Sequence, residues 1–105
     1  MRFTSYLEDK RLTVALTGEI DHHCAKRYMA AIISKIEIYC PKICILDFQD
    51  VSFMDSSGIA VAINAMRSMQ KIGGKLILER LKPQPLKVIL ASGIDKLIEI
   101  REVAV

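Results

Sequence analysis

An apolar run, a polar joint and an amphipathic run follow one another in the middle of this chain. Ile43–Phe48 has the apolar character of a buried strand, Asp55–Gly58 reads Asp-Ser-Ser-Gly, and Ile59–Ile72 has helical periodicity. Strands that are joined through helices are usually parallel neighbours with right-handed connections. The order therefore constrains the chain to an α/β fold and predicts the polar joint at the carboxyl edge of a sheet, where such folds place their functional residues.

Alternation of apolar and polar residues predicts further strands on both sides of this unit. Phe3–Leu7 and Leu12–Leu16 alternate, and Glu8-Asp9-Lys10 lies between them, which indicates a β-hairpin. Lys75–Glu79 predicts another strand, and Leu97–Ile100 predicts a short last one. The strands from Leu12 onwards are expected to end at Thr17, Phe48 and Glu79 and to share one carboxyl edge.

Three segments have the periodicity of helices. Asp21 is the expected N-cap of the first, which Pro41 ends, and Gly73-Gly74 ends the second. Pro83 opens the third, and Gly93 ends it. The expected buried positions are Ala25, Met29, Ile32, Ile33 and Ile36, then Ile59, Ala62, Ile63, Met66 and Met69, then Leu86, Ile89 and Leu90.

These elements predict one α/β domain over residues 1–105. It has an N-terminal β-hairpin followed by alternating β and α elements. The sheet is expected to be mixed, mostly parallel, and to contain about five strands.

Composition excludes several classes of function. Hydrophobic residues make up 51% and charged residues 26%, the profile of a globular protein, and no apolar run approaches the roughly 20 residues that span a membrane. The net charge of +3 is spread along the chain, so no basic stripe predicts nucleic-acid binding.

Three cysteines without a Cys-x-x-Cys pair argue against disulfides and zinc, and Cys44 is expected in the core. Reduced thiols and a first segment without a signal-peptide core predict the cytoplasm, and no cofactor is expected.

The polar joint places two hydroxyl groups at a helix N-terminus. Free backbone N–H groups and the positive end of the helix dipole would accept a phosphate there. The simpler interpretation is helix capping, because Ser and Asp are preferred N-caps. Ser56, at the cap, is expected to be more exposed than Ser57. Because both strands end at the same edge, Asp21 and Ser56 are expected on the same side of the molecule.

Three sequence blocks extend this interpretation. They are Leu16–His23, Val51–Gly58 and Gln70–Leu76. In this order and spacing, the blocks resemble the anti-sigma factor antagonists of the STAS domain class over nearly the whole chain. The Asp-His-His that follows Leu-Thr-Gly-Glu favours the sporulation branch, whose members antagonise the anti-sigma-F factor.

The resemblance implies a regulatory binding protein and not an enzyme. The unphosphorylated form would bind an anti-sigma factor that is also a serine kinase and so release a sigma factor. Phosphorylation of Ser56 would inactivate it, and a serine phosphatase would reset it. The implied partner-binding residues are Asp21, His22, Asp55, Ser56, Ser57, Gly58 and Val61, with no catalytic residue and no metal site.

We expect specific roles for two of these residues, and the family pattern leads to a third expectation, about the C-terminus. Gly58 would let a kinase approach the hydroxyl closely. Val61 is expected to lie off the apolar face of its helix, exposed as a docking contact. Family members commonly carry another helix after the last strand, for which this sequence, ending at Val105, leaves little room.

Two other functions compete with this interpretation. The first is a STAS domain that serves another pathway, as a stress-response partner switch or a scaffold. The second is a serine hydrolase in which Ser56 is the nucleophile and His22 or His23 the base. Against the hydrolase, the sequence has no Gly-x-Ser-x-Gly elbow and no obvious acid to orient the histidine.

Metal-dependent chemistry is a weaker alternative. His22 and His23 would point about 100° apart on a helix, and no third ligand is suitably spaced. Asp47, Asp50 and Asp55 could suggest a magnesium-assisted phosphoaspartate site, which requires clustered carboxylates. Asp50 and Asp55 are more simply explained as turn residues, so no metal is expected.

Overall fold

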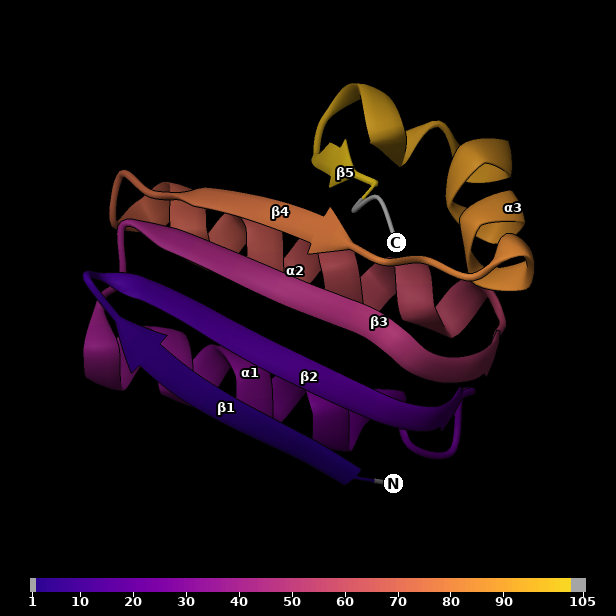
Figure 1. The fold of residues 1–105 in the computed structure, drawn as a ribbon, viewed down its shortest axis with the longest axis horizontal. Coiled ribbons are helices and arrows are strands. Elements are labelled where there is room, and N and C mark those ends of the chain that lie inside the picture. Colours follow the sequence, from indigo (N-terminus) through magenta and orange to yellow (C-terminus); the bar gives the residue numbers. More distant parts are fainter. Residues whose placement is uncertain (1, 103–105) are drawn as a thin grey trace.

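The computed structural model, which describes residues 2–102, consists of a sheet and a layer of helices on one of its faces (Figure 1). The elements, in chain order, are β1 (Arg2–Glu8), β2 (Arg11–Ile20), α1 (Ala25–Tyr39), β3 (Ile43–Met54), α2 (Ser56–Lys71), β4 (Lys75–Glu79), α3 (Pro83–Ser92), the 3₁₀ helix η1 (Ile94–Lys96) and β5 (Glu99–Arg101).

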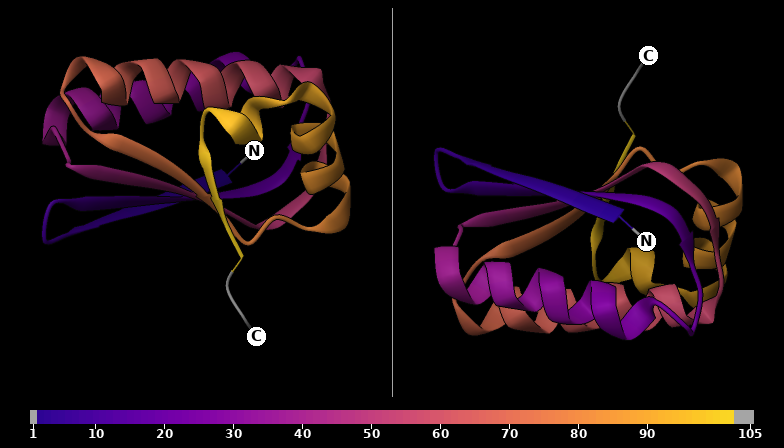
Figure 2. Two further views of the ribbon diagram at one scale, coloured as in Figure 1. Left: turned by 90° about the horizontal axis from the view of Figure 1, so that it is seen from above. Right: turned by 90° about the horizontal axis from the view of Figure 1, so that it is seen from below.

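The five strands follow chain order across the sheet. β1 is antiparallel to β2, and the pairs β2–β3, β3–β4 and β4–β5 are parallel. A connection that always steps one strand in the same direction with the same hand keeps its helices on one side. Figure 2 shows α1 and α2 side by side on one face of the sheet, with α3 at the end of the sheet towards which β2 and β3 curve. The expected α/β fold with a mixed, mostly parallel sheet is confirmed.

The N-terminal hairpin has the turn that its twist favours. Glu8 pairs with Arg11, and the two residues between them are both in the left-handed region, Asp9 with φ 50° and Lys10 with φ 63°. Positive φ at both central residues is the mark of a type I′ turn, which matches the twist of paired strands. The expected hairpin is confirmed.

β2 and β3 are both longer than the sequence predicts. β2 continues past Thr17 to Ile20, and β3 continues past Phe48 to Met54. The pairing register between them shifts twice, and Gly18 adopts φ 95° beside the second shift. These irregularities interrupt the alternation, so the expected ends at Thr17 and Phe48 were wrong.

The C-terminal third departs less from expectation. β4 and α3 begin at the predicted positions, and Gly93, with φ 81°, ends α3. β5 begins at Glu99 and not at Leu97, because Ile94–Lys96 forms the short helix η1 and Leu97 lies exposed after it. Ile89 is buried as predicted, but Leu90 is exposed.

The core lies between the sheet and the two long helices. α1 buries Ala25, Tyr28, Ile32 and Ile36, and α2 buries Gly58, Val61, Ala62, Ala65 and Met69. The predicted face of α2 was therefore partly wrong, because Ile59, Ile63 and Met66 lie at its margins. The middle of the buried face of α2 consists of the small residues Gly58, Ala62 and Ala65, which allow close packing on the sheet. A prediction that looks for large apolar residues at helical spacing misses this face.

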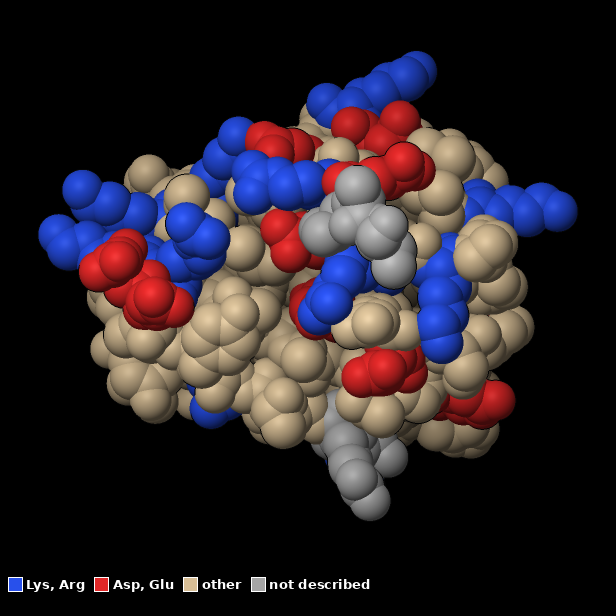
Figure 3. All heavy atoms as spheres, viewed as in Figure 1, with Lys and Arg blue, Asp and Glu red and all other residues tan. Residues whose placement is uncertain are grey.

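The uncovered face of the sheet carries charges of both signs. Figure 3 looks onto this face and shows acidic and basic side chains mixed over β4 and β5. Asp47 pairs with Arg80, Lys75 with Glu99, and Arg101 with Glu79. Within residues 2–102, no helix combines the length and the apolar character that crossing a membrane requires.

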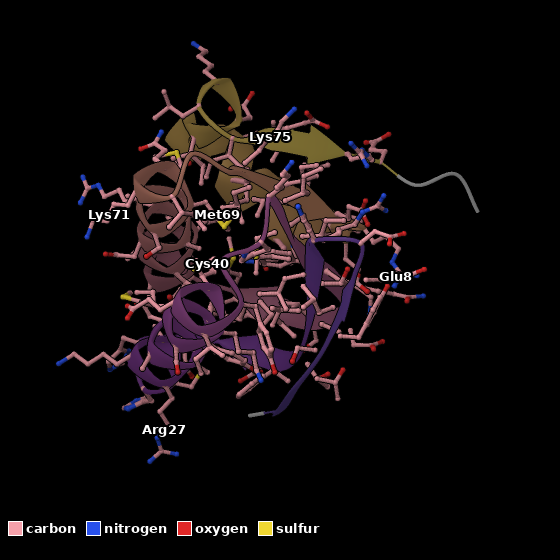
Figure 4. All side chains as sticks on the ribbon, turned by 90° about the vertical axis from the view of Figure 1, so that its left-hand side faces the viewer. Glu8, Arg27, Cys40, Met69, Lys71 and Lys75 are labelled. Atoms are coloured by element: carbon pink, nitrogen blue, oxygen red, sulfur yellow. The ribbon has the colours of Figure 1, made fainter. Side chains whose placement is uncertain are left out.

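The end of the molecule remote from the polar joint contains turns between elements. Figure 4 faces this end, where Glu8 precedes the hairpin turn, Cys40 follows α1 and Lys75 begins β4. Cys44 is fully buried in β3, and burial raises the pKa of its thiol to about 12. The expected core role of Cys44 is confirmed.

Candidate functional site

Two aspartates follow paired positions of neighbouring strands. Ile20 of β2 pairs with Met54 of β3, and the Asp55 N–H donates to the Ile20 carbonyl oxygen at 3.1 Å. Asp21 and Asp55 therefore leave the sheet next to one another, at the end of β2 and β3 that meets α3 in Figure 1. The expectation that Asp21 and Ser56 lie at one edge of the sheet is confirmed.

The junction between β3 and α2 is a complete helix cap. Asp55 is extended, with φ −100°, and its carboxylate accepts the Ser57 N–H at 2.8 Å. The Gly58 N–H donates to the Asp55 carbonyl oxygen at 3.0 Å. The expected placement of both serines at a helix N-terminus is confirmed. The expected cap position of Ser56 was wrong, because Asp55 is the N-cap and Ser56 is the first helical residue.

Ser56 and Ser57 differ in accessibility. Ser56 is exposed, and Ser57 is half-buried. Within residues 2–102, the Ser56 hydroxyl has no hydrogen-bond partner, whereas the cap is already satisfied by the carboxylate of Asp55. The Ser56 hydroxyl is therefore free to react without loss of the cap.

Asp21 caps a turn and not the helix that it was expected to cap. Its carboxylate accepts the N–H groups of His23 at 2.9 Å and Cys24 at 3.2 Å, but α1 begins only at Ala25. Partial burial by itself raises the pKa of Asp21. Hydrogen bonds from the Cys24 thiol and from the two N–H groups, together with the charge of His23, outweigh this effect and lower the pKa below its ordinary value.

The two histidines lie exposed in this turn. Their ring centroids are 3.9 Å apart and the planes meet at 38°, so they face one another and do not diverge as neighbours on a helix would. Among the described residues, no three His, Cys, Asp or Glu side chains are placed to hold a metal ion. Neither histidine forms a hydrogen bond with Ser56 within this range, as a serine hydrolase would require.

Two expectations for the start of α2 change. A Cβ atom on Gly58 would lie 2.2 Å from Cγ and 2.4 Å from Sδ of Met54, so packing against Met54 already explains this glycine. Val61 is only 1% exposed, so the expectation that it is an exposed docking contact is wrong. Val61 belongs to the core cluster together with Ala62 and Ala65 of the same helix.

The remaining acidic residues have separate environments. Asp47 is 7% exposed on the uncovered face, where it accepts the Gln49 N–H at 3.0 Å and Arg80 Nε at 3.0 Å. The hydrogen bond to Asp47 raises the pKa of Arg80. Asp50 lies within β3 opposite Thr17, so its expected role in a turn was wrong. Nothing in this arrangement assembles a phosphoaspartate site.

One residue at this edge was not found from the sequence. Gln84, in the first turn of α3, forms two hydrogen bonds with the backbone of Met54. A glutamine between two prolines has no pattern that announces a contact with a strand 30 residues earlier. Only the folded arrangement shows that α3 reaches the joint.

The chain is similar to known proteins in both sequence and fold. The family model described as STAS domain matches residues 5–104. The chain is 32% identical over 83 residues to an anti-sigma F factor antagonist of Lysinibacillus sphaericus, which covers 79% of this chain and 71% of that protein. It is 30% identical over 90 residues to an anti-sigma-B factor antagonist of Bacillus subtilis strain 168, with coverages of 85% and 80%.

The fold is similar to a solved structure of the anti-sigma factor antagonist SpoIIAA in its unphosphorylated form. The TM-score is 0.84 at 28% sequence identity, and the match covers 98% of this chain and 89% of that one. The likeness therefore extends over the whole α/β arrangement described above.

Proposed function

The chain belongs to the STAS domain family and is of the anti-sigma factor antagonist type, and from this we propose that it is a phosphorylation-switched binding protein. The unphosphorylated form binds an anti-sigma factor that is also a serine kinase and so releases a sigma factor. Phosphorylation of Ser56 inactivates it, and a serine phosphatase restores it. The protein acts in the cytoplasm, without a cofactor and without binding nucleic acid or a membrane.

The observation that carries this proposal is the unused hydroxyl of Ser56. It is exposed at the first position of a long helix whose cap is already supplied by Asp55. Capping alone would explain a serine whose oxygen accepts a backbone N–H, but this oxygen is not used in that way. A kinase can therefore modify Ser56 without first breaking a contact that holds the fold.

Electrostatics explains why the modification would act on binding and not on folding. A phosphate adds about −1.5 to −2 charges. At a helix N-terminus the dipole favours that charge. In a complex, the same charge must lose water and meet a matching partner group. An anti-sigma factor whose facing surface is acidic or holds a nucleotide phosphate would then bind the phosphorylated protein poorly.

The neighbouring residues complete the proposed partner surface. Asp21 and His22 lie beside Asp55, Ser56 and Ser57 at the carboxyl edge of the sheet. Asp21 contributes its charge to the partner in addition to capping its turn. Gly58 is buried, so it contributes indirectly, by letting the first turn of α2 pack closely on Met54 beneath Ser56 and Ser57.

A second candidate function is the corresponding switch in a stress-response pathway. The identity to an anti-sigma-B factor antagonist supports it. The Asp-His-His sequence, which favours the sporulation branch, supports the first candidate. Pull-down with purified anti-sigma kinases of the F and B types separates the two candidates.

The test of the proposal is phosphorylation by a purified anti-sigma kinase with ATP, followed by peptide mass mapping. We expect one phosphate, on Ser56, and loss of binding to the same kinase afterwards. No incorporation from either type of kinase would overturn the proposal. A phosphorylated protein that binds as tightly as the unmodified one would overturn the switch.

A further inference from the structure

Strand β3 extends far beyond the strand next to it. β3 pairs with β4 from Ile43 to Asp47, where β4 ends, yet β3 continues to Met54. On its other side the extension stays paired, with Ile20 opposite Met54. Beyond Asp47, therefore, one side of β3 has no neighbouring strand among residues 2–102 to bond its backbone groups.

Met54 directs its backbone groups to that open side. In a parallel sheet, successive residues bond alternately to the two neighbours. The Asp55 N–H bonds to Ile20 on the β2 side, so the N–H and C=O of Met54 face the side that β4 has left. Backbone groups of a largely buried residue require partners, since leaving them unpaired is costly.

The side-chain amide of Gln84 takes the place of the missing strand. The Met54 N–H donates to Gln84 Oε1 at 2.8 Å, and Gln84 Nε2 donates to the Met54 carbonyl oxygen at 2.9 Å. A primary amide offers one acceptor and a donor side by side, as a strand residue does. The first turn of α3 is thereby fastened to the residue that immediately precedes the Asp55 cap.

A displacement of Met54 would change the positions of Ser56 and Ser57 in two ways. Its backbone leads directly into Asp55, whose carboxylate holds the Ser57 N–H. Its buried side chain also fills the space above Gly58, in the first turn of α2. The orientation of the first turn of α2 therefore depends on where Met54 is held.

We propose that Gln84 is a positioning residue for the switch, which fixes Met54 and thereby the orientation of Ser56 towards the kinase. The consequence for phosphorylation rests on the proposed function. The effect on the first turn of α2 does not, and it can be measured on the protein alone.

Two variants and one control test this role. Gln84→Leu keeps a similar volume but removes both hydrogen bonds. Gln84→Glu keeps an acceptor for the Met54 N–H, but as a carboxylate it cannot donate to the Met54 carbonyl, whereas the protonated acid can. Gln70→Leu removes the same amide from an exposed position in the last turn of α2 and serves as the matched control.

The first measurement is amide hydrogen exchange by NMR on the isolated protein. In Gln84→Leu we expect exchange of the Met54 and Ser57 N–H groups to accelerate by about tenfold or more, with the Leu46 N–H unchanged. In Gln84→Glu the acceleration relative to wild type should shrink as the pH falls and the carboxyl group takes up a proton. Gln70→Leu should exchange as wild type does at all three positions.

The second measurement is the kcat/KM of Ser56 phosphorylation by the anti-sigma kinase. We expect a decrease of about fivefold or more in Gln84→Leu, at a temperature where circular dichroism shows it folded. Unchanged Met54 exchange would overturn the inference. Faster exchange at Met54, with Ser57 exchange and Ser56 phosphorylation both unchanged, would make Gln84 merely structural and overturn it as well. If wild type takes up no phosphate, the proposed function fails, and the Ser57 exchange alone decides the positioning role.

Discussion

The two junctions at the carboxyl edge share one backbone arrangement. The first junction is Asp21–Cys24, and the second is Asp55–Gly58. In each, the aspartate carboxylate accepts the N–H two residues later, at 2.9 Å and 2.8 Å, and its carbonyl oxygen accepts the N–H three residues later, at 3.3 Å and 3.0 Å. The two aspartates follow the paired residues Ile20 and Met54.

The two junctions share this backbone arrangement, but their residues differ at all three positions after the aspartate. The first junction presents two imidazole rings that lie against one another at a tilt of 38°, and its Cys24 thiol donates to the Glu19 carbonyl oxygen at 3.1 Å. The second presents two hydroxyls and then Gly58, where the Met54 side chain takes the available space. From this comparison we infer a division of roles. The second junction carries the modification, and the first contacts the partner through residues that are not modified.

The sharpest test of this division is removal of each hydroxyl in the second junction. Ser56→Ala should abolish phosphate incorporation, because the exposed and unbonded hydroxyl is lost. Ser57→Ala should only reduce it, because that hydroxyl is half-buried in the first turn. Incorporation is measured by mass mapping after reaction with kinase and ATP. Phosphate found on Ser57 of the wild-type protein would contradict the assignment.

The fourth position of the second junction should tolerate no side chain. Gly58→Ala places a methyl group against Met54 and should destabilise the protein by about 2 kcal/mol, the usual cost of overpacking. Urea unfolding measures this change. In a Met54→Ala background the same substitution should cost much less, as a double-mutant cycle would reveal. Equal costs in both backgrounds would mean that Met54 is not the reason for the glycine.

A permanent charge at Ser56 should separate binding from stability. Ser56→Asp imitates part of a phosphate and suits a helix N-terminus, so its melting temperature should stay near that of wild type. Affinity for the anti-sigma factor should fall by about tenfold, or about 1.4 kcal/mol, because only the complex buries the charge.

Titration and thermal unfolding on one preparation measure both quantities. Ser34→Asp, on an exposed position of α1, is the matched control and should bind as wild type does. Strong destabilisation of Ser56→Asp, or amide shifts that change throughout the sheet, would replace the local switch with a conformational one.

The smallest effect is expected in the first junction. Asp21→Asn keeps an oxygen that accepts the two N–H groups, so stability at neutral pH should hardly change, whereas the lost charge should weaken binding to the anti-sigma factor. Binding is measured by titration with wild type alongside. An unchanged affinity would leave Asp21 with the capping of its turn as its only role.

The pH dependence of Asp21 has a defined sign. Its folded pKa lies below the ordinary 3.8, so the ionised form stabilises the folded state. This contribution is complete above the unfolded pKa and disappears as the pH falls through the folded pKa. Any difference in urea midpoint between wild type and Asp21→Asn should therefore shrink below the ordinary value. A difference that grows on acidification would contradict this sign.

Local sequence was sufficient for the elements and for the placement of Ser56. The hairpin, the starts of β3, β4 and α3, and the helix N-terminus at the serines were all predictable. Each depends on signals within a few residues, such as alternation, the two prolines of α3 or the Asp-Ser-Ser-Gly joint. The resemblance of three sequence blocks to STAS antagonists supplied the functional hypothesis, and the family match supports it.

The lengths of β2 and β3, the face of α2 and the contact from Gln84 were decided only in three dimensions. A strand ends where its neighbour stops pairing, and two bulges in β3 keep it paired with β2 as far as Ile20 and Met54. Val61 is buried in the core cluster with Ala62 and Ala65, a placement that the periodicity of its helix alone did not predict. Gln84 bonds to Met54 because β4 ends at Glu79 and does not extend far enough to pair with the N–H and C=O of Met54. Such contacts join residues far apart in the chain, so no local pattern encodes them.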